Sequence, residues 1–294
     1  LVTPMQNIIT NFGSGITVAG AVLIAQYIGA GEKEDARSMA NQIFACAMGF
    51  AVVCATLCFL GTPAIVNWLG ADGGTAYYAR VYLRVVIWDM PFLYMVNIFS
   101  AVHQAQGDTV RPMFLNLGGI TLNLFLDPFF MIILNLGTAG AALATLLAKA
   151  IPAIVAFGLL CRQENDICLN RKYMRLQKEK LGMILKIGLP TAIGGSTMQL
   201  GFLLMSKNVF VYGTEAMAAY GIGNKVNGLI TLPSNAIGSA TATIVGQSMG
   251  AKQSDRAEKG YRFSMWISVV FLFIGGMILS RDMISTAIVR IFSK

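Results

Sequence analysis

The sequence predicts an all-α integral membrane protein, and its composition, its long apolar segments and an internal repeat favour this fold class. Apolar residues make up 55% of the 294 residues and charged residues only 12%, about half of the roughly 25% that is typical of a soluble domain. The apolar residues lie in continuous runs rather than in the ten-residue alternating segments of an outer-membrane barrel. We therefore expect helices that cross a bilayer.

Eight apolar segments are long enough to cross a hydrocarbon core of about 30 Å. They cover residues 4–28, 42–62, 80–104, 111–135, 137–161, 183–211, 216–249 and 261–280. The seventh segment is unusually long, and Pro233 inside it is a candidate kink. The sequence thus predicts eight transmembrane helices.

The basic residues indicate which loops face the cytoplasm. The alternate loops 29–41, 105–112, 162–186 and 250–262 carry 14 Lys and Arg, whereas the other loops and the C-terminal end carry 5. The positive-inside rule places the first set in the cytoplasm. We expect a multi-pass protein of the plasma (inner) membrane, in contact with lipid. The net charge of +8 lies in gaps between apolar runs, so we expect no nucleic-acid partner.

An internal repeat relates the first helix region to a later one. The stretch "LIAQYIGAGEKEDA" at 23–36 matches "IVGQSMGAKQSDRA" at 244–257 with an offset of 221 residues. The matched pairs are Gln26 with Gln247, Gly29 with Gly250, Ala30 with Ala251 and Ala36 with Ala257. Six spans begin within one period, and six is an even number, so the repeats should run parallel, as in two-lobed transporters.

Two full periods would hold twelve spans, so we expect one further span before this chain and three after it. The predicted organisation is an N-terminal lobe of five helices at 1–161, a cytoplasmic linker at 162–186 and the start of a C-terminal lobe of three helices at 187–294.

Several short motifs resemble one family of transporters. They are "LIAQYIGAG" at 23–31, "QGDTVRPM" at 106–113, "LNLFLDP" at 122–128, "GTAGAALAT" at 137–145, "IGLP" at 187–190 and "VGQSMGA" at 245–251. Together, and in this order, they resemble the multidrug and toxic compound extrusion (MATE) family of cation-coupled efflux transporters. The resemblance implies spans two to nine of twelve and two six-helix lobes around a cavity of alternating access. It also implies a monomeric antiporter that exports small organic cations in exchange for sodium or protons, without a cofactor.

Asp127 is the main candidate for ion coupling, because a carboxylate inside an apolar span is costly and marks a functional site by default. The hairpin that follows turns near Leu136, with Asp127 nine residues before the turn and Thr145 nine residues after it. At 1.5 Å per residue both lie about 13–14 Å deep, and Asn123 is one helical turn from Asp127. Oxygen atoms at one depth could bind sodium or a proton, and the resemblance assigns this role to the same three residues.

A structural role for Asp127 is the alternative. Lys149 lies thirteen residues after the turn, at the depth of Asn123. An ion pair between Asp127 and Lys149 would only hold the hairpin together.

Four other polar residues are candidates for the cavity: Asp89, Lys149, Gln199 and Lys225. Asp89 should lie about a third of the way into its span, where Arg84 could pair with it instead. Lys225 has a structural role as its alternative. The "GLPTAIGGSTMQLGF" stretch has Gln199 and no carboxylate, which argues against a second coupling site in the C-terminal lobe.

Two other functions stay open at this stage, namely a flippase for lipid-linked precursors from a related family and a fragment that does not transport. An enzyme is not expected, because the sequence shows no nucleophile–base pair, metal cluster or phosphate-binding loop.

Overall fold

A computed structural model describes residues 3–68, 84, 87–162, 167–170 and 173–279. These residues form eight α-helices and one short π-helix, and no strand occurs among them. The helices are α1 (Thr3–Gly29), α2 (Lys33–Trp68), α4 (Asp89–Ala105), α5 (Val110–Pro128), η1 (Phe129–Ile133), α6 (Gly137–Cys161), α7 (Lys178–Phe210), α8 (Thr214–Gly250) and α9 (Ser254–Leu279). The prediction of an all-helical fold is confirmed.

Six of the described helices have the length and apolar composition that a membrane crossing needs: α1, α2, α5 continued by η1, α6, α7 and α9. Of the eight predicted spans, the other two correspond to α4 and α8. The described part of α4 has only 17 residues. Helix α8 has 37 residues but contains many Gly, Ser, Thr and Asn residues. It continues through Pro233 as one helix.

Helix α4 begins later than the sequence predicts. The segment 80–104 was expected to be one span, but residues 87 and 88 form a turn and the helix starts at Asp89; most of 80–86 lies outside the described residues. Pro91 explains this start, because a proline in the first turn of a helix removes an N–H that would have no partner there. Asp89 is therefore at the N-terminus of a helix, where the helix dipole favours a negative charge.

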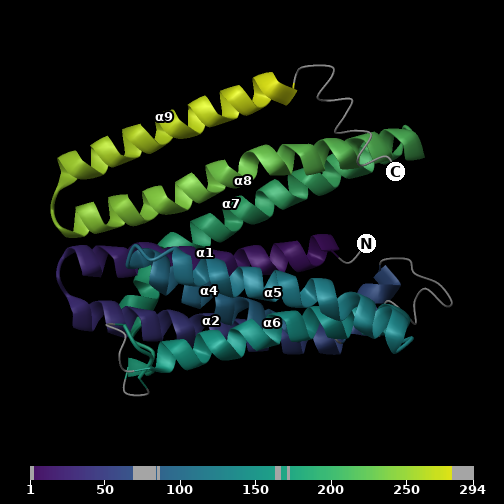
Figure 1. Ribbon diagram of the computed structural model, residues 1–294. Coiled ribbons are helices and arrows are strands. Elements are labelled where there is room, and N and C mark those ends of the chain that lie inside the picture. Colours follow the sequence, from purple (N-terminus) through teal and green to yellow (C-terminus); the bar gives the residue numbers. More distant parts are fainter. Residues whose placement is uncertain (1–2, 69–83, 85–86, 163–166, 171–172, 280–294) are drawn as a thin grey trace.

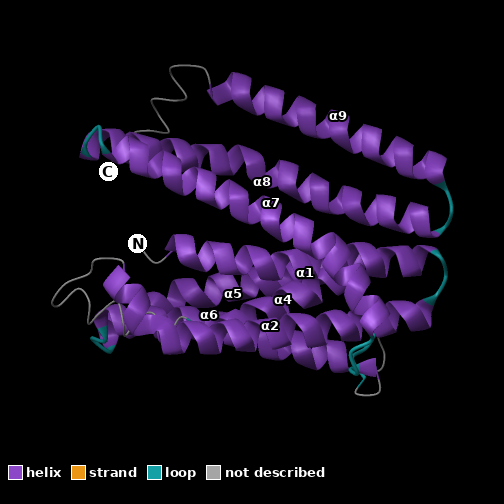
Figure 2. Cartoon of the chain, turned by 180° about the vertical axis from the view of Figure 1, so that it is seen from behind, coloured by secondary structure: helices purple, strands orange, loops and turns teal. Residues whose placement is uncertain are grey.

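The helices run antiparallel to one another in chain order (Figure 1). The α1–α2 and α8–α9 connections lie at the same end of the molecule as the described part of the 162–177 segment, whereas the α5–α6 and α7–α8 connections lie at the opposite end. Helices α7, α8 and α9 form a group beside α1, and they diverge from α1 toward the end that holds the α7–α8 connection (Figures 1 and 2).

The buried core lies among α1, α2, α4 and α6. Tyr94 and Phe99 of α4 and Ile24, Met39 and Ile43 of the first two helices are almost completely buried. The core cluster extends along the chain only as far as Ile184, near the start of α7. Burial of such side chains is the main stabilising contribution to the fold.

The two copies of the sequence repeat contact each other in the structure. A Cβ atom at Gly29 would lie 2.0 Å from the carbonyl oxygen of Gln247, and one at Gly250 would lie 1.9 Å from the carbonyl oxygen of Gln26. The contact is reciprocal, as in an interface around a two-fold axis. Only glycine allows the backbones of α1 and α8 to approach so closely. The Gln247 side chain also donates a hydrogen bond of 2.7 Å to the carbonyl of Ala105, at the end of α4.

The described part of the linker is attached to α2 by two amide side chains. Asn41 and Gln42 are completely buried. Asn41 donates to the carbonyl of Cys168 and accepts from the N–H of Asn170, and Gln42 binds the backbone at three points between 173 and 177. Residues 167–169 are buried beside them. This segment is irregular rather than a surface helix, and α7 begins at Lys178.

Candidate functional site

A cavity of about 270 Å³ lies between α4, α5 and α6. Eleven residues line it: Leu93, Val96, Leu115, Asn116, Gly119, Ile120, Asn123, Thr145, Ala148, Lys149 and Pro152. Most of the lining is apolar, with a few polar groups, which is the usual composition of a small-molecule site. The cavity is deep, since Asn123 is about 20 Å along α5 from Val110 at 1.5 Å per residue.

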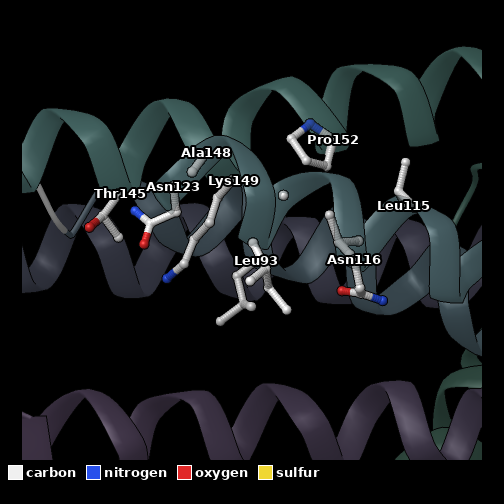
Figure 3. Close-up of a pocket in the computed structure, with 11 residues that line it drawn as sticks. Leu93, Leu115, Asn116, Asn123, Thr145, Ala148, Lys149 and Pro152 are labelled. Atoms are coloured by element: carbon white, nitrogen blue, oxygen red, sulfur yellow. The ribbon is translucent and has the colours of Figure 1, made fainter. Parts of the chain in front are cut away.

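Three of the four polar residues that line this cavity gather at one end of it (Figure 3). Figure 3 shows the side-chain ends of Thr145, Asn123 and Lys149 close together, with Leu93 beyond them and Asn116 at the other end. The structure thus places Asn123 and Thr145 at one cavity, at similar depths on neighbouring helices.

The oxygen atoms of these side chains are the groups that remain for a ligand. Asn116 donates its amide N–H to the carbonyl of Pro112 at 2.8 Å, and the Thr145 hydroxyl donates to the carbonyl of Ala141 at 2.9 Å. Asn123 donates to the carboxylate of Asp127 at 3.4 Å. With these hydrogens engaged, carbonyl and hydroxyl oxygens can accept from, or coordinate, a cation.

Asp127 lies one helical turn beyond Asn123, half-buried at the end of α5. The next residue, Pro128, has no N–H to donate to the preceding turn, and the helix continues as the π-helical segment η1. Short π-helical segments are frequent at functional sites and interrupt the regular bonding of a helix. Protonation of Asp127 or binding of a cation to it would therefore occur next to a segment that lacks the regular hydrogen bonds of an α-helix.

Lys149 is paired with Asp89 rather than with Asp127. Its Nζ lies 2.5 Å from Oδ2 of Asp89, and the exposed fractions of the two side chains are 35% and 5%. The alternative in which Lys149 binds Asp127 is therefore not the arrangement in the structure. Arg84 was the alternative partner for Asp89, but Asp89 pairs with Lys149, and the guanidinium carbon of Arg84 lies 5.8 Å from the centre of the Phe59 ring. The pair of Asp89 with Lys149 forms because α4, which starts at Asp89, packs beside α6.

The two remaining candidates lie away from this cavity. Gln199 is half-buried on α7, and Lys225 is an exposed residue of α8. Neither is among the residues that line the cavity between α4, α5 and α6.

Asn116 is a cavity residue that the sequence reasoning missed. It precedes Asn123 by seven residues, and this spacing places both side chains on the same face of a helix. The spacing of Asn116, Asn123 and Asp127 was a usable signal. Within the described residues, no group of three or more His, Cys, Asp or Glu could hold a metal ion.

A helical bundle with polar groups buried deep between its spans is the architecture of a membrane transporter. The chain belongs to the MatE family, whose model matches residues 1–129 and 190–293. The predicted family is therefore confirmed.

Curated relatives and a solved structure agree with this membership. The chain is 29% identical over 287 residues to the probable multidrug resistance protein NorM of Thermotoga maritima, covering 95% of this chain and 60% of NorM. It is 24% identical over 283 residues to the probable multidrug resistance protein YoeA of Bacillus subtilis, covering 94% of this chain and 60% of YoeA. The chain thus spans about 60% of the length of these relatives.

The fold matches a MOP-superfamily transporter from Pyrococcus furiosus with a TM-score of 0.91 at 22% identity, over 99% of this chain and 64% of the other.

Proposed function

We propose that the protein is a secondary antiporter of the plasma membrane that exports small organic cations in exchange for sodium or protons. Its family and the names of its relatives as multidrug resistance proteins support export of such compounds. In this proposal the linker 162–186 faces the cytoplasm and the protein acts as a monomer.

One observation carries the proposal. The Asp127 carboxylate accepts a hydrogen bond from Asn123, beside a cavity that is lined by Asn123 and Thr145 with their side-chain oxygen atoms. A cation at this place would be held by one carboxylate and two neutral oxygens. Such a site suits either a sodium ion or a protonated carboxylic acid, because hydrocarbon surroundings favour any form in which the negative charge is balanced.

Exchange follows if the coupling ion and the organic cation compete for the same carboxylate. When the ion enters from outside and neutralises Asp127, the cavity loses its attraction for the organic cation, which leaves. Pro128 and the π-helical segment η1 follow Asp127 directly. Neutralisation of Asp127 can therefore alter how α5 packs against α6. A ligand shifts a conformational equilibrium only by its difference in affinity between states, and the charge of Asp127 supplies that difference.

Transport in reconstituted vesicles tests the proposal. The protein as its gene encodes it is placed in liposomes, and movement of ethidium, a monovalent organic cation, is recorded with and without an imposed sodium or proton gradient. We expect one gradient to accelerate transport. In Asp127→Asn the gradient should lose its effect, a change of about 5–150-fold for a typical coupling energy.

The control is Asp255→Asn, which removes an exposed carboxylate at the start of α9 and should leave coupling intact. A gradient effect that survives in Asp127→Asn would contradict the proposal.

A further inference from the structure

The ion pair between Asp89 and Lys149 reaches the same cavity through Lys149, which is one of its lining residues. Asp89 is nearly inaccessible, while Lys149 is partly exposed and lines the cavity. Asp89 is the first residue of α4 and Lys149 lies in the middle of α6, so each is positioned by a rigid element. The ammonium group thus reaches both the buried carboxylate and the space in which a ligand would lie.

The charges around this cavity can be counted from the helices that enclose it. Between Val110 and Cys161 the charged residues are Arg111, at the start of α5, Asp127 and Lys149. Helix α4 adds Asp89 and, at its far end, His103. Helix α1, which packs against α4, carries no charged residue. With both carboxylates ionised, the deep charges are two negative and one positive.

We propose that Lys149 is a resident cation that neutralises Asp89 and thereby limits the cavity to one mobile positive charge, held at Asp127. The pair is then a determinant of charge selectivity, because the cavity accepts monovalent cations in preference to divalent ones. The inference rests on the proposed role of Asp127 in cation exchange.

Elementary electrostatics supports this assignment. A carboxylate that is 5% exposed is costly unless it is paired, and its interaction with a nearby cation is far stronger in the protein than in water. The N-terminus of α4 favours the negative charge of Asp89, and the ammonium of Lys149 completes its neutralisation. Removal of Lys149 would leave two carboxylates for a ligand, whereas removal of Asp89 would free an ammonium group that competes for Asp127.

A matched pair of dyes tests the inference in the purified protein as its gene encodes it. Ethidium and propidium share a phenanthridinium ring, but ethidium carries one positive charge and propidium two. The dissociation constants of both are measured by fluorescence for the wild type and for Lys149→Met. We expect the ratio of the ethidium constant to the propidium constant to rise at least about tenfold in Lys149→Met, since a second carboxylate becomes available.

Two further variants separate selectivity from folding. Asp89→Asn leaves no buried carboxylate unpaired, and its freed Lys149 should weaken ethidium binding at least about tenfold. The double variant with Asp89→Asn and Lys149→Met should return both constants to near the wild-type values. Lys207→Met, which removes an exposed lysine in the last turn of α7, should change neither constant.

The outcomes are distinct. If folded Lys149→Met keeps the wild-type dye ratio, or if Asp89→Asn binds ethidium as the wild type does, the pair only joins α4 to α6 and the inference is wrong. If Lys149→Met yields no folded protein, the dye dissociation constants of Asp89→Asn and of the double variant test the inference instead. Failure of the proposed function looks different, because Asp127→Asn would then bind ethidium with wild-type affinity.

Discussion

The helices up to α6 and the helices α7 to α9 differ in both packing and charge. The core cluster comes from α1, α2, α4, α6, the linker and the start of α7, whereas most large apolar side chains of α9 are exposed. Among the residues that the structure describes, deep carboxylates occur only in the first region, at Asp89 and Asp127. In α7 to α9 the carboxylates are confined to the helix starts, as at Glu179 and Glu215, and to the first turns of α9.

This difference indicates a division of roles. The first region holds the cavity between α4, α5 and α6 and the carboxylates of Asp89 and Asp127. The second region contacts it mainly through α1, at Gly15 with Gly188 and, in the repeat, at Gly29 with Gln247 and at Gly250 with Gln26. Lys225 of α8 is exposed, and no residue of α8 lines the cavity between α4, α5 and α6. Three substitutions test how firmly the second region is attached to the first.

Loss of the Gln42 side chain should have the largest effect on stability. Gln42→Leu would leave the carbonyls of Tyr173 and Arg175 and the N–H of Gln177 without their present partner. An unpaired buried polar group costs about 1–3 kcal/mol, so we expect a loss of about 3 kcal/mol or more and faster tryptic cleavage after Arg175. Gln253→Leu, at an exposed glutamine, is the control. Equal cleavage rates in both variants would show that the linker is not held by Gln42.

The contact between the repeat copies should be the next most sensitive. In Gly250→Ala the new methyl group would overlap the carbonyl oxygen of Gln26, so α8 must move away from α1. Overpacking of this kind costs about 1–3 kcal/mol, and the thermal midpoint of unfolding in detergent should fall. Gly238→Ala is the control in the same helix, because nothing lies within 4 Å of its Cβ position. That substitution should leave the midpoint unchanged or raise it, since alanine favours a helix by about 0.5–1 kcal/mol. A similar midpoint in both variants would contradict the close approach.

The ion pair between α2 and α7 should contribute least. Lys180 lies 2.9 Å from Asp35, whose side chain is 52% exposed, and exposed pairs contribute about 0–1 kcal/mol. Asp35→Asn should therefore lower the thermal midpoint slightly at low salt and not at high salt. Glu34→Gln removes the neighbouring acid in the same first turn of α2 and serves as the control for the helix-dipole effect. If Glu34→Gln has the larger effect, the pair with Lys180 is not what stabilises this junction.

Local sequence patterns were sufficient to predict much of the fold. The hairpin near Leu136 was predicted from the ends of two apolar runs, and the structure ends η1 at Ile133 and starts α6 at Gly137. The same local geometry predicted that Asp127 and Thr145 lie at similar depth, with Asn123 one helical turn from Asp127. Asn123 and Thr145 line one cavity, whereas Asp127 is not among its lining residues. Such predictions need only the rise of a helix and the position of one turn.

Features that depend on which helices are neighbours could not be predicted in this way. Asp89 and Lys149 are 60 residues apart, and their pairing follows from the packing of α4 against α6. The sequence predicted a cytoplasmic linker from its charges, but it did not show that Asn41 and Gln42 hold this segment. Two adjacent amides at the start of an apolar run were the available signal, since buried amides require partners.

Ion release on binding of an organic cation tests most directly whether coupling belongs to the first region. Ethidium is added to the purified protein, and displaced sodium is counted by loss of bound ²²Na⁺, while released protons are followed with a pH indicator in weak buffer. We expect the wild type to release one of the two ions as ethidium binds, Asp127→Asn to release neither, and Gln199→Met in α7 to behave as the wild type. Ion release that persists in Asp127→Asn, or that is lost in Gln199→Met, would contradict a coupling site at Asp127.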